Sequence, residues 1–522
     1  MSAPPSTEQV PQQSSTGRTR GRLRGAVAGL LAAATVLGVG HLVAAFIDPA
    51  SSPFFVLGAT MVDHTPHELK DAAIRRFGSN DKLALFVSMA LVMAVGAALA
   101  GLLERRRPYG SIALLVLGAV TAVAALQRPT ATVWFVLPTV IGIAAGVLAL
   151  RMLVAGTPSP LAPAPAALSR RRFLVSAAAV GALAVGAAAA GRVLGARLRD
   201  VVADRARFLL PRTGVPAPEV PADARPDVPG LTSFITPADD FYRVDTALQI
   251  PALTSSDWRL RIHGMTDRTV EFDFDRLRQL TPVERVLTLT CVSNEVGGTL
   301  AGTARWLGYP LAQLLGAAGV RPDADMLLSR SIDGFTASTP LAAVLDGRDA
   351  LLAIGMNGAP LPLAHGYPAR LIVPGLYGYV SATKWVVDLE VTRFDRATAY
   401  WTDRGWADRA PIKTASRIDV PAAFATVAAG PVTVAGVAWA QRRGIAGVEV
   451  QVDDGPWQAA TLAAEYSIDT WRQWTWQWTA TPGTHTIRVR AVDRAGETQS
   501  EQRTPPFPSG STGWHSRVFT VR

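Results

Sequence analysis

The chain has 522 residues, more than one hydrophobic core usually organises, so several domains are expected. Its hydrophobic share is 49% and its formal net charge is +10. Residues 1–198 hold 18 Lys and Arg against 7 Asp and Glu, whereas the remainder holds 33 against 34. Because no excess positive charge is left for the C-terminal part, nucleic acid is not expected as a partner. The single cysteine, Cys291, excludes an intramolecular disulfide.

Five apolar runs precede residue 200, and each is near the roughly 20 residues that cross a bilayer core. They cover about 25–46, 83–103, 110–127, 130–153 and 175–195. Arginines precede the first run, separate the second from the third, and separate the fourth from the fifth. Because positive charge marks the cytoplasmic side, residues 1–198 are predicted to form a multi-pass plasma-membrane anchor. Its N-terminus is expected in the cytoplasm and the chain after residue 195 outside it.

The segment SRRRFL, Ser169 to Leu174, stands directly before the fifth run. A serine before paired arginines and a Phe-Leu after them resemble the twin-arginine export signal. Three ordinary stop-transfer arginines are the alternative interpretation. Cells use twin-arginine export chiefly for proteins that acquire a cofactor before they cross, so the motif points to a cofactor in the exported part.

The exported part changes character along its length. Residues 199–230 contain six prolines and predict a stiff spacer. From 231 to 395, β-prone runs such as WRLRIHG and TVEFDF alternate with helical ones such as GYPLAQLLGAAGV, which predicts a mixed α+β domain. After a linker over 396–414, residues 415–522 carry only strand-like runs, which predicts an all-β immunoglobulin-like sandwich. The predicted fold class is therefore multi-domain, with an all-α bundle of five spans before these two domains.

Cys291 ends the β-prone run 286–290 and precedes Asn294 and the pair Gly297–Gly298. Glycines suit a loop whose backbone comes close to a ligand. The thiolate could bind a redox-active metal or act as a nucleophile, and a buried structural cysteine is the third interpretation. The nucleophile interpretation would resemble sortases through TLTC, although His263 and Arg305 fit the spacing in those enzymes poorly.

Longer stretches carry a second resemblance. The segments TCVSNEVGG, ARWLGYPLAQLL, DGFTASTPL and LLAIGMNGAPLPLAHGYPARLIVPGLYGYVSATKW resemble the sulfite oxidase family of molybdopterin enzymes in order and spacing. DDFYRVD is similar to that family's first cofactor loop, and VEVQVDDGPWQAATL is similar to its C-terminal dimerisation domain. The resemblance covers residues 235–522 and implies a sulfite-oxidase-type molybdopterin domain over 231–395.

The resemblance also implies the chemistry of the site. Molybdenum with molybdopterin would be the cofactor, with Cys291 as the metal ligand, and two-electron oxygen-atom transfer the reaction. The implied cofactor contacts are Phe241, Tyr242, Arg243, Asp245, Asp333, His365, Arg370, Ser381 and Lys384. The candidates for catalytic contacts beside Cys291 are Arg243, Arg305, Trp306, Tyr377 and Tyr379.

Departures from the family pattern leave the substrate open. Val244–Asp245 stands where the family has Asn-His, and Glu295–Val296 where sulfite-oxidising members have paired arginines. A small oxyanion or S-oxide-type substrate is therefore expected without a more specific assignment. No haem-binding segment is evident, and His41 is the one histidine within the apolar runs, so no haem is expected in this chain. A separate electron-transfer partner is expected instead. The resemblance implies a homodimer, although an anchored β-sandwich can equally contact a membrane partner. The alternative function is non-catalytic surface binding on a degenerate molybdopterin fold.

Overall fold

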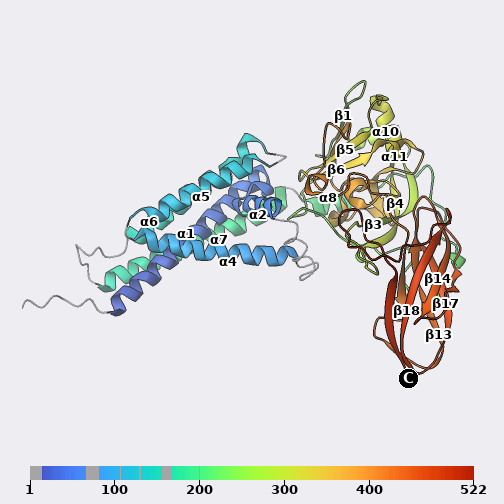
Figure 1. The fold of residues 1–522 in the computed structure, drawn as a ribbon. Coiled ribbons are helices and arrows are strands. Elements are labelled where there is room, and N and C mark those ends of the chain that lie inside the picture. The colour runs from blue at the N-terminus through green and yellow to red at the C-terminus, as the bar shows by residue number, and fades with distance from the viewer. Residues whose placement is uncertain (1–14, 66–80, 106, 129–130, 156–165, 199) are drawn as a thin grey trace, which may run out of the picture. The chain divides into compact units, whose positions relative to one another are not determined.

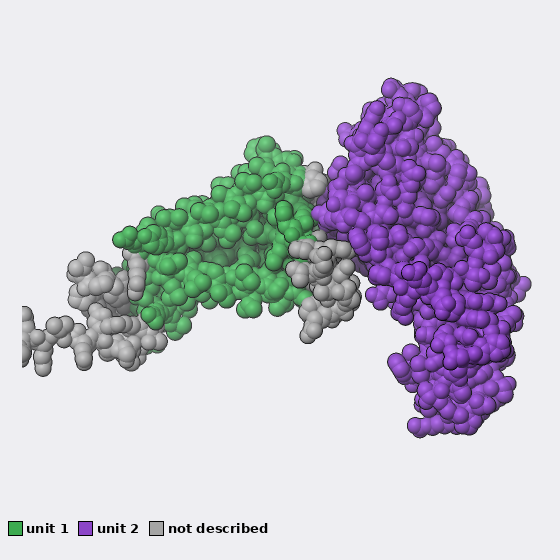
Figure 2. Space-filling view, in the orientation of Figure 1, with its two compact units in different colours: residues 1–200 green, residues 201–522 purple. Residues whose placement is uncertain are grey.

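The structure is a computed structural model that describes residues 15–65, 81–105, 107–128, 131–155, 166–198 and 200–522 (Figure 1). The chain divides into two compact units, residues 1–200 and 201–522, which Figure 2 shows in different colours. The predicted start of the fourth span, residue 130, lies outside the described residues.

The first unit is helical, and the described residues include five helices that are long and apolar enough to cross a membrane, as the hydropathy pattern predicts. These candidate spans are Gly21–Ile47, Leu83–Glu104, Tyr109–Leu126, Val133–Ala155 and Arg170–Arg207. The described helices of the unit are α1 Ser15–Ile47, η1 Pro49–Ser51, α2 Pro53–His64, α4 Asp81–Glu104, α5 Tyr109–Leu126, η3 Val133–Val136, α6 Leu137–Ala155 and α7 Ala166–Leu198. The short helix α2 lies between the first two spans and was not predicted from the sequence.

Helix α1 is the centre of this bundle, because it packs against α4, α6 and α7. Its contact with α4 is made through glycines. A Cβ atom added at Gly29 would lie 1.9 Å from the carbonyl oxygen of Ala97, and one added at Gly101 would lie 2.0 Å from that of Gly25. Small residues let the backbones of membrane helices approach closely, so these glycines set the spacing of α1 and α4.

The second unit holds the mixed domain and the β-sandwich. In the mixed domain and the segments around it, the elements are α8 Val201–Arg207, η4 Ala222–Ala224, β1 Leu260–Gly264, β2 Val270–Phe272, α9 Phe274–Leu277, β3 Val283–Thr290, β4 Ala301–Pro310, α10 Leu311–Ala318, β5 Met326–Ser331, β6 Thr336–Pro340, α11 Leu341–Leu345, β7 Leu351–Met356, β8 Ala359–Pro360, η5 Leu363–His365, β9 Arg370–Ile372, α12 Gly378–Ser381, β10 Val386–Thr392 and η6 Thr402–Arg404. The sandwich contains β11 Ala415–Val420, β12 Thr426–Val427, β13 Gly430–Trp439, β14 Ile445–Val452, β15 Gln458–Ala459, β16 Thr461–Leu462, β17 Arg472–Ala480, β18 Gly483–Asp493 and β19 His515–Val521.

The mixed domain contains two sheets. One has the order β2-β1-β10-β5-β6, and the other has the order β3-β4-β7-β8 with β9 paired to β7. In the second sheet, Thr290 at the end of β3 lies opposite Ala301 at the start of β4. The segment 291–300 therefore connects the antiparallel neighbours β3 and β4. The pairing of these two strands holds the ends of the segment together.

The β-sandwich is immunoglobulin-like, with sheets in the orders β11-β13-β17-β16 and β12-β19-β18-β14-β15. Figure 1 labels its long strands β13, β14, β17 and β18. Its core is filled by alternate residues of the long strands, including Trp474 and Trp476 of β17 and Ile487 and Val489 of β18. This period-two burial is what the strand-like sequence pattern predicts, and the described sandwich residues confirm the all-β interpretation.

The two segments predicted as a spacer and a linker pack onto the mixed domain. In residues 199–230, Phe208 is buried in the domain core and Val215 forms a parallel bridge with Val283. In residues 396–414, Trp406 is buried in the same core. Apolar side chains of both segments pack against the domain. Neither segment is a free spacer along its whole length.

Candidate active site

Cys291 is the first residue of the connection between β3 and β4, and its side chain is buried. Its backbone N–H donates to the carbonyl of Leu300 at 2.9 Å, and its own carbonyl accepts from Asn294 N–H at 3.1 Å. The Asn294 side chain closes the loop, because Oδ1 accepts from Leu300 N–H at 2.8 Å. Burial raises the pKa of the Cys291 thiol, while a hydrogen bond with Ser293 opposes this shift. The loop therefore carries one buried thiol, and hydrogen bonds among Cys291, Asn294 and Leu300 hold its backbone in place.

An aromatic cluster contains the first predicted cofactor residues. The Phe241 ring stacks on Tyr242 with centroids 5.2 Å apart, and it meets Trp306 and His365 edge-on at 5.8 and 5.6 Å. Gly302 on β4 leaves room for this ring, since an added Cβ would lie 2.8 Å from it. Burial raises the pKa of the Tyr242 hydroxyl, with Cys291 adding to the shift and Arg370 opposing it.

Arg370 brings a buried positive charge to the cluster from the start of β9. Its guanidinium carbon lies 5.3 Å from the Trp306 ring centroid, and Nη1 donates to the carbonyl of His365 at 3.2 Å. Its Nε has no hydrogen-bond partner among the described residues. Burial lowers the pKa of Arg370 to about 10, so the side chain remains charged at neutral pH. A buried cation with a free donor is costly unless an anion or acceptor completes it.

Lys384 supplies the second buried cation. Its Nζ lies 2.6 Å from Oδ2 of Asp245 and donates to the carbonyl of Ala364 at 3.3 Å. Burial lowers the pKa of Lys384 to about 8, and Asp245 opposes this shift. The β-bridge between Arg370 and Lys384 fixes their spacing, so the two cations belong to one site.

The remaining cofactor candidates surround these cations. Asp333 is partly buried, and burial raises its pKa, with Asp245 adding to the shift and Lys384 opposing it. His365 donates from Nε2 to the carbonyl oxygen of Ala238 at 3.1 Å. Burial, followed by the charges of Arg370 and Lys384, lowers the pKa of His365 to about 4, so its imidazole is neutral at pH 7.

Arg243 is the more accessible charge at the edge of the site. Its side chain is 38% exposed, and Nε lies 2.8 Å from Oδ2 of Asp245. Because Asp245 also binds Lys384, the carboxylate joins one exposed and one buried cation. Of these three residues, Asp245 stands at the position where the sequence departs from the Asn-His of the family it resembles.

Tyr377, like Tyr242, carries a buried hydroxyl near Cys291. Burial raises its pKa to about 12, and the charge of Cys291 contributes in the same direction. The Ser381 hydroxyl is bound by the chain itself, because Oγ donates to the carbonyls of Leu376 and Tyr377 at 3.0 Å each. Ser381 therefore holds the Tyr377 segment in place.

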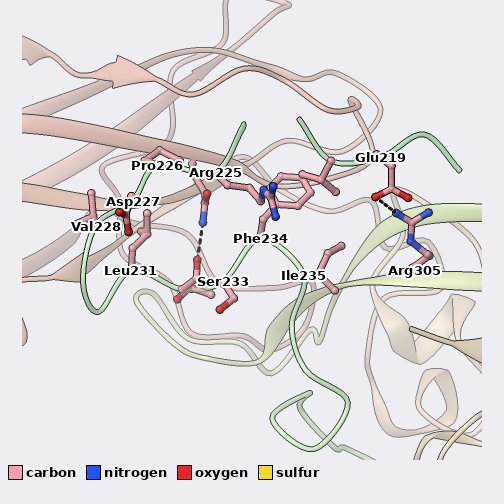
Figure 3. A pocket seen from close by; sticks show the side chains of 13 residues that line it. Glu219, Arg225, Pro226, Asp227, Val228, Leu231, Ser233, Phe234, Ile235 and Arg305 are labelled. Carbon is pink, nitrogen blue, oxygen red and sulfur yellow. Dashed lines mark hydrogen bonds and ion pairs between the residues drawn. The ribbon is translucent and has the colours of Figure 1, made fainter. Parts of the chain in front are cut away.

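Arg305 is not brought to this cluster. Trp306 points into it, and successive strand side chains point to opposite faces, so Arg305 points away. Its Nη1 donates to Glu284 at 3.0 Å and to the carbonyl of Ala217 at 3.1 Å. Figure 3 shows Arg305 beside Glu219 at a separate pocket of about 440 Å³. The expected contact between Arg305 and the substrate therefore has no support in its placement.

Tyr379 also faces elsewhere. Its hydroxyl donates to the carbonyl of Ala407 at 2.5 Å, and its ring lies 5.7 Å from that of Trp406. Nor does the structure favour the nucleophile interpretation, because His263 pairs with Asp388 at 3.0 Å on the sheet that does not contain β3. A base for Cys291 is thus not provided by His263.

One residue near the site was missed from the sequence. The backbone N–H of Lys413 lies 3.5 Å from the Tyr377 hydroxyl, and its Nζ donates to the carbonyl of Gly510 at 2.5 Å. Lysine is rare here, with four in the whole chain, which was the available signal. Lys413 was not considered as a site residue because it lies in the predicted linker 396–414.

These residues fit a molybdopterin cofactor. A soft thiol ligand suits molybdenum, and the pterin phosphate needs cations and N–H donors, which Arg370 and Lys384 provide. The unpartnered Nε of Arg370 and the unpartnered Oγ1 of Thr290, both buried within the described chain, are polar atoms that such a group could complete. Asp333 offers a carboxylate for the ring N–H groups.

Comparison with known proteins gives the same assignment. Residues 247–401 match the family model described as the oxidoreductase molybdopterin binding domain, and residues 415–489 match the bacterial Ig domain. Mitochondrial sulfite oxidase from Mus musculus is 31% identical over 301 residues, covering 49% of this chain and 54% of the mouse protein. The enzyme from Homo sapiens is 29% identical over 349 residues, covering 56% of this chain and 63% of the human protein. The chain thus spans a little over half the length of these relatives.

A solved structure is similar as well. The sulfane dehydrogenase SoxCD from Paracoccus pantotrophus is 23% identical, with a TM-score of 0.49, and the match covers 56% of this chain and 84% of that one. The family match and the sulfite oxidases agree with the buried cysteine and the paired cations described above. Residues 247–401 therefore form a molybdopterin-binding oxidoreductase domain, with molybdenum-molybdopterin as its cofactor, and the chain is similar to the sulfite oxidases over this region.

Proposed function

We propose that this protein is a membrane-anchored, extracytoplasmic oxidoreductase that transfers an oxygen atom to or from a small sulfur oxyanion or S-oxide. The observation that carries the proposal is the buried thiol of Cys291 in one site with the buried cations Arg370 and Lys384. The thiol of Cys291 is the soft donor that molybdenum needs. Arg370 and Lys384 are the positive charges that the phosphate of a pterin cofactor needs.

Each residue then has a definite task. Cys291 ligates the metal, Arg370 and Lys384 bind the phosphate, and Asp333 accepts from the ring N–H groups. When bound, the cofactor supplies two-electron oxygen-atom transfer. Arg243, which is partly exposed, attracts the substrate anion, and the neutral Tyr377 hydroxyl orients it by donating a hydrogen bond.

For sulfite, the atoms and electrons balance simply. Sulfite and water give sulfate, two protons and two electrons, and the electrons pass to a separate electron-transfer protein. The sulfite oxidases among the relatives support sulfur compounds as the substrate class. Sulfite is the first substrate to test.

The location follows from the helices and the charges around them. Five helices long enough to span a membrane support anchoring. An arginine-rich segment before the first span and an odd number of candidate spans support a location outside the cytoplasm for the residues after 198. The SRRRFL motif, Ser169 to Leu174, then serves as an internal twin-arginine signal for the folded domain.

The test uses full-length protein purified in detergent. We expect one molybdenum per chain and sulfite-dependent reduction of ferricyanide. Cys291→Ser should fold and reach the membrane but lose this activity by orders of magnitude, because a hydroxyl is a poorer ligand than a thiolate. Metal analysis, the thermal midpoint and the ferricyanide rate measure these three outcomes.

Alkylation gives an independent control, because Cys291 is the single thiol in the chain. A thiolate bound to molybdenum is shielded from iodoacetamide. Rapid alkylation of metal-loaded wild-type protein would contradict the ligand assignment. Absence of molybdenum from freshly prepared membranes would favour the non-catalytic binding protein instead.

A further inference from the structure

The immunoglobulin-like domain holds the strand that leads into Cys291. Thr288, three residues before the cysteine, donates from its N–H to the carbonyl of Asp469 at 3.0 Å. Its Oγ1 accepts from Trp471 N–H at 2.8 Å, and its carbonyl accepts from the side chain of Gln441. Three hydrogen bonds from the C-terminal domain therefore meet at one residue of β3.

The same domain holds the loop after the cysteine. Ser511 Oγ donates to the carbonyl of Asn294 at 2.6 Å, and Arg417 Nη1 donates to the carbonyl of Gly298 at 2.9 Å. Gly297 has a positive φ of 79°, and an added Cβ would lie 2.3 Å from the His515 ring. The loop thus fits against a surface made by the start of β11, the 511 segment and the start of β19.

These contacts come from fixed groups. Arg417 is 4% exposed, and its guanidinium also binds Asp419 at 2.6 Å and Thr232 Oγ1 at 2.9 Å. Trp471 is fully buried in the core of the mixed domain, where Nε1 donates to the carbonyl of Phe234 at 3.0 Å. A donor held in this way constrains its acceptor, so the interface restricts the loop more than a mobile surface contact would.

We propose that the immunoglobulin-like domain sets the position of the Cys291 thiolate, with Arg417 and Ser511 as positioning residues. The inference rests on the proposed role of Cys291 as the molybdenum ligand. Groups that orient a metal ligand tune the metal itself. The segment from Thr288 to Gly298 is held by the C-terminal domain on both sides of the cysteine, so the direction of the sulfur depends on that domain.

The test compares variants of the full-length, cofactor-loaded protein. Ser511→Ala and Arg417→Met each remove a donor to the loop, and Arg417→Lys retains a cation. The matched control is Arg472→Met, because Arg472 donates to the carbonyls of Ala463 and Ile445 within the sandwich and does not donate to the loop. Readouts are the molybdenum content, the Mo(V) electron paramagnetic resonance spectrum, and the sulfur-to-molybdenum absorption band.

Ser511→Ala and Arg417→Met should shift the resonance and the absorption band at unchanged molybdenum content, and Arg417→Lys should shift them less. Hydrogen exchange at Leu300, whose N–H bonds to Asn294, should quicken about fivefold, the factor for losing roughly one hydrogen bond. Arg472→Met should lower the thermal midpoint and leave both spectra unchanged.

Unshifted spectra in Ser511→Ala and Arg417→Met would overturn the inference, as would an equal shift in Arg472→Met. Wild-type protein that holds no molybdenum would instead overturn the proposed function. The metal content of the wild type therefore distinguishes failure of the proposed function from failure of the positioning inference.

Discussion

Arg370 and Arg305 lie in the same sheet but have opposite surroundings. Arg370 is buried, stacks on Trp306, and has an Nε without a partner among the described residues. Arg305 donates to Glu284 and to backbone carbonyls on the other face of β4. At the residue scale, Arg370 is therefore prepared for an anion, whereas Arg305 is already neutralised by the protein.

This difference predicts separate effects for two variants. Arg370→Met should lower bound molybdopterin by about 10-fold or more, because a charge-assisted hydrogen bond contributes about 1.5–3 kcal/mol. It should leave the cofactor-free fold stable, since replacing a buried charge by an apolar side chain is often neutral. Cofactor content after gel filtration and the thermal midpoint measure the two effects.

Arg305→Met is the matched control. It leaves the half-buried Glu284 carboxylate without its ion pair, so a loss of about 1–3 kcal/mol in unfolding free energy is expected with cofactor content intact. Cofactor loss in Arg305→Met, together with full loading in Arg370→Met, would reverse the assignment of the two arginines.

At the scale of elements, the packing of α1 on α4 depends on backbone approach. A Cβ added at Gly101 would lie 2.0 Å from the carbonyl oxygen of Gly25, and a backbone atom in a helix cannot move aside as a flexible side chain does. Gly96 lies on the same helix, and an added Cβ there meets nothing within 4 Å. Substitutions at these two glycines therefore distinguish the effect of helix packing from the effect of helix propensity.

We expect Gly101→Leu to destabilise the helical unit by at least about 1–3 kcal/mol, the usual range for overpacking. Gly96→Leu should have little effect or a small favourable one, because it replaces glycine in a helix without a clash. Thermal unfolding in detergent, followed by circular dichroism, compares them. Equal midpoints for the two variants would show that the glycine contact does not determine the packing of α1 and α4.

At the scale of the whole molecule, the proposed function requires that the catalytic domain be exported across the membrane. Replacing Arg170 and Arg171 by Lys keeps the charge but removes the arginine pair of the twin-arginine motif. The first four spans should still insert, while residues after 198 remain inside. Protease added to spheroplasts should then no longer cleave the catalytic domain.

Replacement of Arg18 and Arg20 by Lys is the control, because it retains charge outside the motif. Cleavage should continue in that variant as in the wild type. If the Arg170 and Arg171 variant is cleaved equally, the arginines act as stop-transfer charges and the export signal lies elsewhere.

Some features were determined by the sequence alone. The five apolar runs predicted five helices because crossing a bilayer requires a continuous apolar stretch, which is a local property. The order of a mixed domain and a β-sandwich followed from periodicity, which is also local. The position of Cys291 between a strand and a glycine-containing loop could be predicted for the same reason, since the strand, the cysteine and the glycines are neighbours in the chain.

Other features were decided by tertiary structure. The sequence could not show that Arg305 points away from Trp306's face of β4, because that required knowing which face of β4 meets Phe241. It could not show that residues 199–230 pack on the domain, or that Ser511 reaches Asn294 across more than 200 positions. Such contacts depend on how distant elements pack, and packing is set by the summed burial of many side chains rather than by any local pattern.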